Sequence, residues 1–366
     1  ISGLVELVPT TAHVTRYIKI VMEKSILRNL IYLANDISKE AFDDSQDVDD
    51  ILESVQRSIF SITQDRLQKG FEKIDPVLHK TFEDIDRIAS HKGSVIGVPS
   101  GFSDLDSKTT GFQNGDLVII AGRPGMGKSS LAMNLAENVL FDKESLGGVL
   151  IFSLEMSAES LTTRMLSGIS KIDQQKVRSG MLGDKELQVL IEQSDKLKNL
   201  PLWIDDSSLL SPMELRAKAR RLARTEHHGL SLIVVDYLQL MQLPMSTENR
   251  VNQISEISRS LKSLAKELSV PVIALSQLNR AVEQRPNRRP VMADLRDSGA
   301  IEQDADVILF IYRDSEYNED SEHGNKAEID VAKQRNGPTG VINLTFLKEF
   351  TRFENFSSDS FYESFE

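Results

Sequence analysis

From about residue 115 onward, short apolar runs alternate with stretches of helical spacing. Several of these runs are apolar at every position, which is typical of parallel strands covered on both faces. The alternation predicts an α/β domain with a mostly parallel central sheet. The last strands, between 305 and 347, have no long helices between them and are predicted to form antiparallel hairpins. The predicted strands are Leu117–Ala121, Val149–Leu154, Leu202–Asp205, Leu232–Asp236, Val272–Leu275, Val307–Ile311, Ile329–Ala332 and Ile342–Phe346.

The first part of the chain has helical spacing instead. Residues 16–35 carry one apolar stripe, an acidic stretch follows, and residues 49–65 carry a second stripe. The two predicted helices would form an antiparallel hairpin. Its core is too small to be stable alone, so we expect it to pack on a partner or on further protein.

A linker is predicted over 67–75, and Asp75-Pro76 has the pattern of a helix start. The short helix predicted over 76–89 has one apolar side, at Leu78, Phe82, Ile85 and Ala89. This side docks either on its own domain or on a neighbouring subunit, and the spacing leaves both open. The predicted organisation is a helical hairpin (1–66), a linker with a docking helix (67–95), the α/β domain (96–354) and an acidic tail (355–366). Disorder is expected from Phe353 onward, where the sequence becomes acidic and rich in serine.

Composition excludes several classes of protein. The 366 residues contain no cysteine, which excludes disulfides, thiolate zinc sites and thiol nucleophiles and fits a reducing cytoplasm. No apolar run is long enough to span a membrane, and no signal peptide is evident. The chain begins at Ile1 rather than Met, which is compatible with a fragment of a longer protein.

Charge does not decide whether the chain binds nucleic acid. The net charge of −12 argues against a polyanion partner. Residues 279–296, however, hold five arginines against two acids. A local basic loop can bind a polyanion while the rest of the surface repels it.

One segment matches a phosphate-binding loop in full and in the right context. It runs Gly122-Arg123-Pro124-Gly125-Met126-Gly127-Lys128-Ser129 between a predicted strand and a predicted helix that opens at Ser130. The glycines let backbone N–H groups approach phosphates, and the helix N-terminus adds partial positive charge. Lys128 would neutralise the β- and γ-phosphates, and Ser129 would coordinate Mg²⁺. The predicted ligands are therefore ATP and Mg²⁺.

Three polar residues follow predicted strands and should meet this loop, because carboxyl ends of parallel strands line one crevice. Asp236 ends a buried strand and would hold the metal; alternatively it caps a turn. Glu155 follows the next strand after the loop and would act as a base; alternatively it is an acid favoured by a helix dipole. Gln277 ends another strand, where a neutral amide would sense a γ-phosphate.

Together these residues resemble a known family. The chain is similar to replicative DNA helicases of the DnaB family, whose motor is a RecA-like ATPase. The runs that carry the resemblance are Gly122–Ser129, Ser153–Met156, Val234–Gln239, Ser276–Arg280, Asp294–Gly299, Ile301–Asp306 and Lys333–Pro338. The hairpin at 16–65 resembles the end of the family's N-terminal domain, and the globular head of that domain is missing from this sequence.

The resemblance implies roles that spacing alone does not give. Glu155 is implied to be the general base, and Gln277 to couple the γ-phosphate to DNA loops. Lys333 and Arg335 are implied to reach the neighbouring subunit's ATP, with Arg335 as arginine finger. A solvated hairpin is the alternative for this pair, although Lys-x-Arg does place both side chains on one face of a strand.

The resemblance also implies the partners. Arg296, Asp297 and Gly299 are similar to the loop that tracks single-stranded DNA in the family's ring; a solvated loop is the alternative for the arginine cluster before it. A homohexamer, a helicase loader and a primase are implied, with translocation 5′→3′. The rival functions are a RecA-like recombinase or recombination mediator, which would form filaments, and a nucleotide-regulated scaffold, which would not need Glu155.

Overall fold

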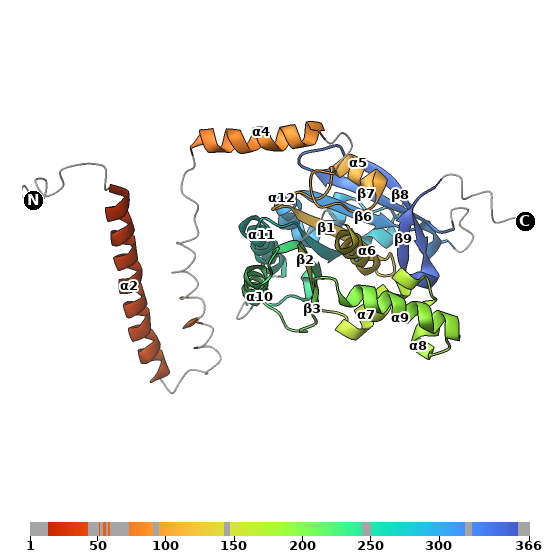
Figure 1. The fold of residues 1–366 in the computed structure, drawn as a ribbon, viewed down its shortest axis with the longest axis horizontal. Helices are drawn as coiled ribbons and strands as arrows, with labels where there is room; N and C mark the ends of the chain where they lie inside the picture. Colours follow the sequence, from red (N-terminus) through yellow and green to blue (C-terminus); the bar gives the residue numbers. More distant parts are fainter. Residues whose placement is uncertain are drawn as a thin grey trace, which may run out of the picture. The chain divides into compact units, whose positions relative to one another are not determined.

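The computed structural model describes residues 14–42, 51, 54–55, 58, 73–90, 95–142, 147–243, 250–318 and 324–357. The chain divides into two compact units, 1–90 and 91–366 (Figure 1). The first unit contains helix α2 (Val14–Ala41) and helix α4 (Ile74–Ser90). The helices predicted over 16–35 and 76–89 are thus confirmed, each with extra residues at its ends. The helix predicted over 49–65, and with it the hairpin, falls almost wholly outside the described residues.

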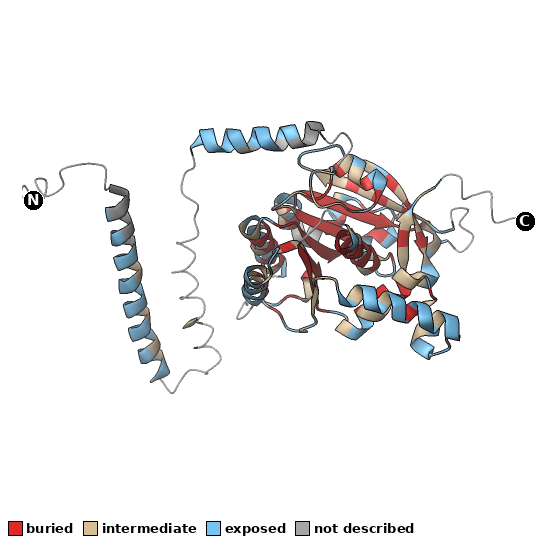
Figure 2. Cartoon of the chain, in the orientation of Figure 1, coloured by how far each residue is buried: buried red, intermediate tan, exposed pale blue. Residues whose placement is uncertain are grey.

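Helix α4 begins where its sequence predicts, with Asp75 in its first turn and Pro76 beside it. The apolar side chains of α4 that the structure describes are exposed (Figure 2). Phe82 is 61% exposed, and Leu78 and Ile85 are each nearly half exposed. Within the first unit, the described side chains of the α4 stripe are therefore exposed to solvent.

The second unit is built on a sheet of nine described strands. Six neighbouring strands are parallel, and three antiparallel strands extend one side of the sheet. The predicted fold class and the predicted antiparallel hairpins are confirmed. In sheet order the strands are β3 (Leu202–Asp205), β2 (Gly148–Ser153), β4 (Leu230–Asp236), β5 (Val272–Gln277), β1 (Leu117–Gly122), β6 (Val307–Tyr312), β7 (Lys326–Gln334), β8 (Gly340–Leu347) and β9 (Arg352–Asn355).

Helices cover both faces of this sheet, which explains why its central strands are apolar at every position. On one face of the sheet, Val118 and Ile120 of β1 pack against helix α6 (Lys128–Phe141). Leu117 and Ile119 pack against the other face with helices α10 (Pro212–Thr225) and α11 (Arg250–Leu268). The remaining α-helices are α5 (Ser103–Thr109), α7 (Ala158–Ser170), α8 (Gln174–Ser179), α9 (Asp184–Lys198) and α12 (Gly299–Asp304).

The prediction of disorder from Phe353 is wrong for its first residues. Phe353 is buried, its ring lies 4.7 Å from that of Phe346, and its N–H donates to the side chain of Asn134 at 2.7 Å. These partners are remote in sequence, so local composition gave no sign of the strand. Residues 358–366 of the predicted tail lie outside the described residues.

The two edges of the sheet carry different chemistry because of strand direction. The parallel strands β1, β2, β4, β5 and β6 all end at the edge where the phosphate-loop sequence begins. Strand β7 runs the other way: Glu328 pairs with Tyr312 near that edge, and Gln334 pairs with Val307 at the opposite one. Residues 333–335 therefore lie at the edge remote from the phosphate loop.

Candidate functional site: a phosphate cavity at the carboxyl edge of the sheet

The phosphate loop leaves β1 after Gly122 and enters α6 at Lys128, two residues before the predicted helix start. Gly125 and Gly127 have φ angles of +85° and +95°, which favour glycine. A Cβ on Gly127 would also lie 3.0 Å from the ring of Phe353. The loop therefore requires glycine at both positions, and its N–H groups and the N-terminus of α6 form a site suited to an anion.

Lys128 lies over this loop. Its Nζ donates to the carbonyl of Arg123 at 3.2 Å. Burial lowers the pKa of Lys128, while the charges of Asp236 and Glu155 act in the opposite direction. The charges of Asp236 and Glu155 thus favour the protonated, cationic form of Lys128 at the place where phosphate would bind.

Asp236 is buried at the end of β4 and accepts a hydrogen bond from the hydroxyl of Ser129. Burial raises its pKa, and that hydrogen bond opposes the shift. Its second carboxylate oxygen, Oδ2, is buried and has no hydrogen-bond partner within the described part of the chain. An unsatisfied buried carboxylate oxygen beside a serine hydroxyl fits Mg²⁺, which prefers hard oxygen ligands.

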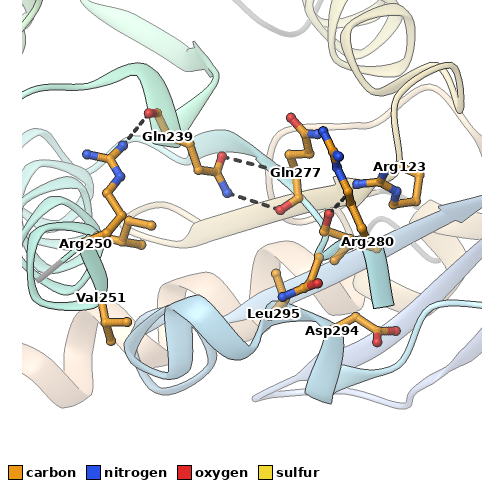
Figure 3. A pocket seen from close by; sticks show the side chains of 11 residues that line it. Arg123, Gln239, Arg250, Val251, Gln277, Arg280, Asp294 and Leu295 are labelled. Atoms are coloured by element: carbon orange, nitrogen blue, oxygen red, sulfur yellow. Dashed lines mark hydrogen bonds between the residues drawn. The ribbon is translucent and has the colours of Figure 1, made fainter. Parts of the chain in front are cut away.

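Glu155 is exposed two residues beyond β2 and lines the same cavity of about 420 Å³ as Lys128, Ser129 and Asp236. The structure therefore brings together the four residues that the sequence placed around the phosphates. Gln277, at the end of β5, lines this cavity too. It also lines a second cavity of about 420 Å³, which Figure 3 shows, and therefore belongs to the lining of both cavities.

Two arginines of the cavity escaped the sequence reasoning. Arg164 on α7 has a buried Nε without a hydrogen-bond partner among the described residues. Burial lowers its pKa, and Asp236 and Glu155 act against that shift. A signal was present: Arg164 follows the buried Leu161 by three positions and so shares the inner face of its helix.

Arg313, the second, follows β6. Its guanidinium lies 4.0 Å from the centre of the Phe346 ring and donates to the carbonyl of Gly125 at 3.1 Å. Burial lowers its pKa, opposed by Glu316. Two of its partners, Gly125 and Phe346, are remote in sequence, so no local pattern marked it.

The side chain of Arg123 does not face the phosphates, although the residue lies in the phosphate loop. It is buried and turns toward the segment after β5, where it bonds the carbonyl of Leu278 at 2.8 Å (Figure 3). Its Nε also donates to the carboxylate of Glu283 at 2.8 Å. Arg123 therefore offers the phosphates only its backbone.

Lys333 and Arg335 are not brought to this cavity. Lys333 donates to the carbonyls of Glu302 and Ala305, the latter at 2.7 Å. Arg335 donates to the carbonyl of Gln303 at 2.6 Å and lies 3.4 Å from a carboxylate oxygen of Asp306. Both side chains thus lie on one side of the strand end, as Lys-x-Arg predicts, at the edge of the sheet away from the phosphates.

The proposed DNA segment is only partly described. Gly299 begins α12 and is exposed, whereas the side chains of Arg296 and Asp297 lie outside the described residues. Two earlier arginines of the basic stretch are held by acids. Arg285 bonds Asp294 at 2.6 Å, and Arg289 bonds both carboxylate oxygens of Glu328 on β7. The stretch is therefore tied to the domain at Arg285 and Arg289.

Comparison with known proteins gives a consistent result. Residues 97–355 match the family described as "DnaB-like helicase C terminal domain". The chain is 46% identical over 356 residues to the replicative DNA helicase DnaB of Geobacillus stearothermophilus, which covers 97% of this chain and 78% of that protein. It is 47% identical over 364 residues to the DnaB of Haemophilus influenzae, covering 97% and 76%.

Two solved structures are similar as well. One of them, described as an ATPase domain, superposes with a TM-score of 0.75 at 38% identity, covering 79% of this chain and 100% of that one. A DnaB-like replicative helicase, solved in a study of its interactions with primase, gives a TM-score of 0.78 at 34% identity, covering 97% and 82%. Among the described residues, no helix combines the length and apolarity needed to cross a bilayer.

Proposed function

The chain belongs to the family of DnaB-like replicative DNA helicases, which are ATP-dependent enzymes, and we propose that it works as a homohexameric ring with ATP held between neighbouring chains. The observation that carries this proposal is the separation of the two halves of the site. Lys128, Asp236 and Glu155 line one cavity, while Arg335 lies beyond the opposite edge of the sheet. One chain supplies the phosphate cavity, and the next supplies the cations that complete it.

Within one chain, the phosphate loop binds and orients ATP. Gly122, Gly125 and Gly127 with Ser130 shape the backbone cradle, Lys128 meets the β- and γ-phosphates, and Ser129 and Asp236 hold Mg²⁺. When bound, Mg²⁺ neutralises the charge that develops on the phosphate oxygens. Glu155 takes the proton of the attacking water. The positive charge of Arg164 offsets the repulsion between the carboxylates of Asp236 and Glu155.

The neighbouring chain supplies Lys333 and Arg335. Two cations on one side of a strand end suit a single phosphate group, and the planar guanidinium of Arg335 suits its oxygens. Arginine fingers in related phosphoryl-transfer enzymes contribute about 10³–10⁵ in rate. The carbonyl contacts of both side chains at α12 support this role, because they hold the cations in place before a partner arrives.

DNA passes along the segment that contains Arg296, Asp297 and Gly299. Contact through backbone and arginine to phosphates ignores base sequence, as a replicative motor requires. Gln277 lies between the phosphate cavity and the second cavity, which this segment adjoins, and passes the state of the γ-phosphate to it. Loss of that phosphate loosens the interface and changes the hold on the strand.

The remaining assignments follow the same family. Residues 1–66 belong to the end of an N-terminal domain, 67–95 link it to the motor, and 96–354 form the motor. A solved relative supports primase as a partner, and a helicase loader is proposed beside it. The cytoplasm of a bacterium or of a phage-infected cell is the proposed compartment, because DNA and ATP occur there together.

The test is unwinding of forked DNA that carries a single-stranded tail on one strand or on the other. Unwinding that needs ATP and a 5′ tail is expected, and the Lys128→Ala chain should bind the fork yet leave it paired. Electron microscopy of the same samples should show rings. Filaments that exchange strands would favour a recombinase, and ATP-independent binding without unwinding would favour a scaffold.

A further inference from the structure

The end of β5 is held from both of its neighbours in the sheet. On the β4 side, the side chain of Gln239 donates to the hydroxyl of Ser276 at 2.9 Å and to the carbonyl of Gln277 at 3.2 Å. On the β1 side, Arg123 donates to the carbonyl of Leu278. Strand β5 lies between β4 and β1 in the sheet. Gln277, which lines both cavities, and Leu278 after it are therefore held by residues that follow β4 and β1 (Figure 3).

Arg123 has a second contact, which phosphate binding does not explain. Its Nε donates to Glu283 Oε1 at 2.8 Å, and its side chain is only 8% exposed. The hydrogen bond from Arg123 lowers the pKa of Glu283, which therefore stays ionised. Breaking an ion pair of a buried arginine is costly, because the buried charge loses its counter-charge.

The same residue contacts Lys128 through its backbone, because the Arg123 carbonyl accepts a hydrogen bond from Lys128 Nζ. A lysine that turns to a phosphate releases this carbonyl. We therefore expect nucleotide binding to change the hydrogen bonding of the Arg123 carbonyl, although the Arg123 guanidinium does not face the phosphates.

Beyond Glu283 the contacts continue toward the proposed DNA segment. Glu283 lies in the short helix η3 (Arg280–Gln284), which Arg285 follows. Arg285 bonds Asp294 at 2.6 Å, and the N–H of Asn279 donates to the Asp294 carbonyl at 3.1 Å. Asp294 lies in helix η4 (Met292–Ser298), together with residues 296 and 297. Two ion pairs, Arg123–Glu283 and Arg285–Asp294, together with the short stretches of backbone between them, thus connect the phosphate loop to the DNA segment.

We propose that Arg123 and Glu283 are positioning residues that couple the nucleotide state of the phosphate loop to the affinity of the 294–299 segment for single-stranded DNA. The inference rests on the proposed function, which places DNA at this segment. Coupling is reciprocal: if ATP strengthens DNA binding by some factor, DNA strengthens ATP binding by the same factor. The pair sets the size of that factor without touching either ligand.

The test uses Glu283→Ala in the full chain, because Glu283 is 43% exposed in its side chain and outside both ligand sites. Affinity for an oligo-dT strand is measured with and without a non-hydrolysable ATP analogue, and affinity for the analogue with and without the strand. Couplings between sites commonly amount to about 5–150-fold. In Glu283→Ala the factor should fall at least about fivefold in both directions, with the affinity for analogue alone unchanged within about twofold. Glu283→Gln, which keeps an acceptor but loses the charge, should lie between.

Glu328→Ala is the matched control. Glu328 holds Arg289 of the same basic stretch by two bonds of 2.7 and 2.8 Å, and it lies on β7, outside the Arg123–Glu283 pair. Its coupling factor should stay within about twofold of the unmodified chain. An equal loss in both variants would mean that general anchoring of the stretch matters, and the inference would be wrong.

A second variant tests the pair as a unit. Arg123→Lys keeps the charge but cannot bond both Leu278 and Glu283 in the same geometry. The double variant Arg123→Lys/Glu283→Ala should lose no more coupling than Glu283→Ala alone. Full coupling in Glu283→Ala would overturn the inference and leave the helicase proposal intact. Absence of any response to single-stranded DNA in the unmodified chain would instead overturn the proposed function.

Discussion

The division of the ATP site between two chains can be tested by mixing two inactive variants. Lys128→Ala removes the phosphate-loop cation, and Arg335→Ala removes the proposed finger. Strand β6 separates the two edges: Val307 and Tyr312 are five residue steps apart, which at about 3.3 Å per step makes roughly 16 Å. An arginine side chain does not bridge that distance, so Arg335 has no route to its own chain's phosphates.

The expected recovery follows from counting pockets. Arg335→Ala alone should be slowed about 10³–10⁵-fold, and Lys128→Ala alone should lose turnover. In an equal mixture, about half the pockets have an intact Lys128, and about half of those face an intact Arg335, so about a quarter recover. A finger acting within its own chain would recover none. Phosphate release is measured after subunit exchange, without DNA, so that pockets turn over independently of one another.

A second mixture fixes the scale. The double variant Lys128→Ala/Arg335→Ala, mixed equally with unmodified chain, should also keep about a quarter of its pockets, whereas a finger within the chain would keep about half. Co-assembly is verified by a tag on one variant. Turnover in the first mixture that stays at the level of either variant, with co-assembly verified, would refute the shared site.

Four further outcomes are expected. Glu155→Gln should bind a fluorescent ATP analogue normally but release phosphate about 10²–10⁴-fold more slowly, as loss of a general base requires; normal release would remove Glu155 from that role. Arg352→Met leaves Glu137 buried without its 2.7 Å partner and should lower the free energy of unfolding by about 3–5 kcal/mol in urea titrations; a change below about 1 kcal/mol would mean that Glu137 is satisfied otherwise. Burial raises the pKa of Asp116 to about 6, above its ordinary 3.8, so its contribution to stability is present below pH 3.8 and is lost as pH rises through 6. In Asp116→Asn the urea midpoint should therefore change less with pH between 3.8 and 6, and an unchanged pH profile would exclude Asp116 as the source of this pH dependence. Phe82→Asp should reduce the hexamer to monomer in light scattering, and an unchanged mass would mean that α4 docks on its own chain.

Much of the fold was predictable because its signals are local. The phosphate loop is a contiguous run whose glycines, lysine and flanking strand and helix all stand within a few residues of one another. Asp236 and Gln277 end apolar strands, and parallel strands bring such ends to one edge whatever the loops between them do. The phosphate loop therefore followed from its motif, and the placement of Asp236 and Gln277 beside it followed from period and strand direction.

What was missed depends on contacts between distant segments. Strand β9 is polar and short, and only the burial of Phe353 beside Phe346 and Asn134 makes it a strand. Arg313 and the side chain of Arg123 have partners remote in sequence, which no periodicity encodes. The motif assigned Arg123 to the nucleotide, whereas packing turned its guanidinium toward Glu283.

The position of the cations also limits how chains can assemble. The phosphate cavity and the Lys333–Arg335 edge are different surfaces of one chain, so the contact that joins them is heterologous. Such a contact closes into a ring or continues as a filament. In a ring every cavity meets a neighbour's cations, so completed sites equal chains in number and the mass stays constant as concentration rises. A filament leaves one cavity open at an end and lengthens with concentration. The shared site therefore predicts, for a ring, one tightly bound ATP analogue per chain at every concentration at which the assembly persists.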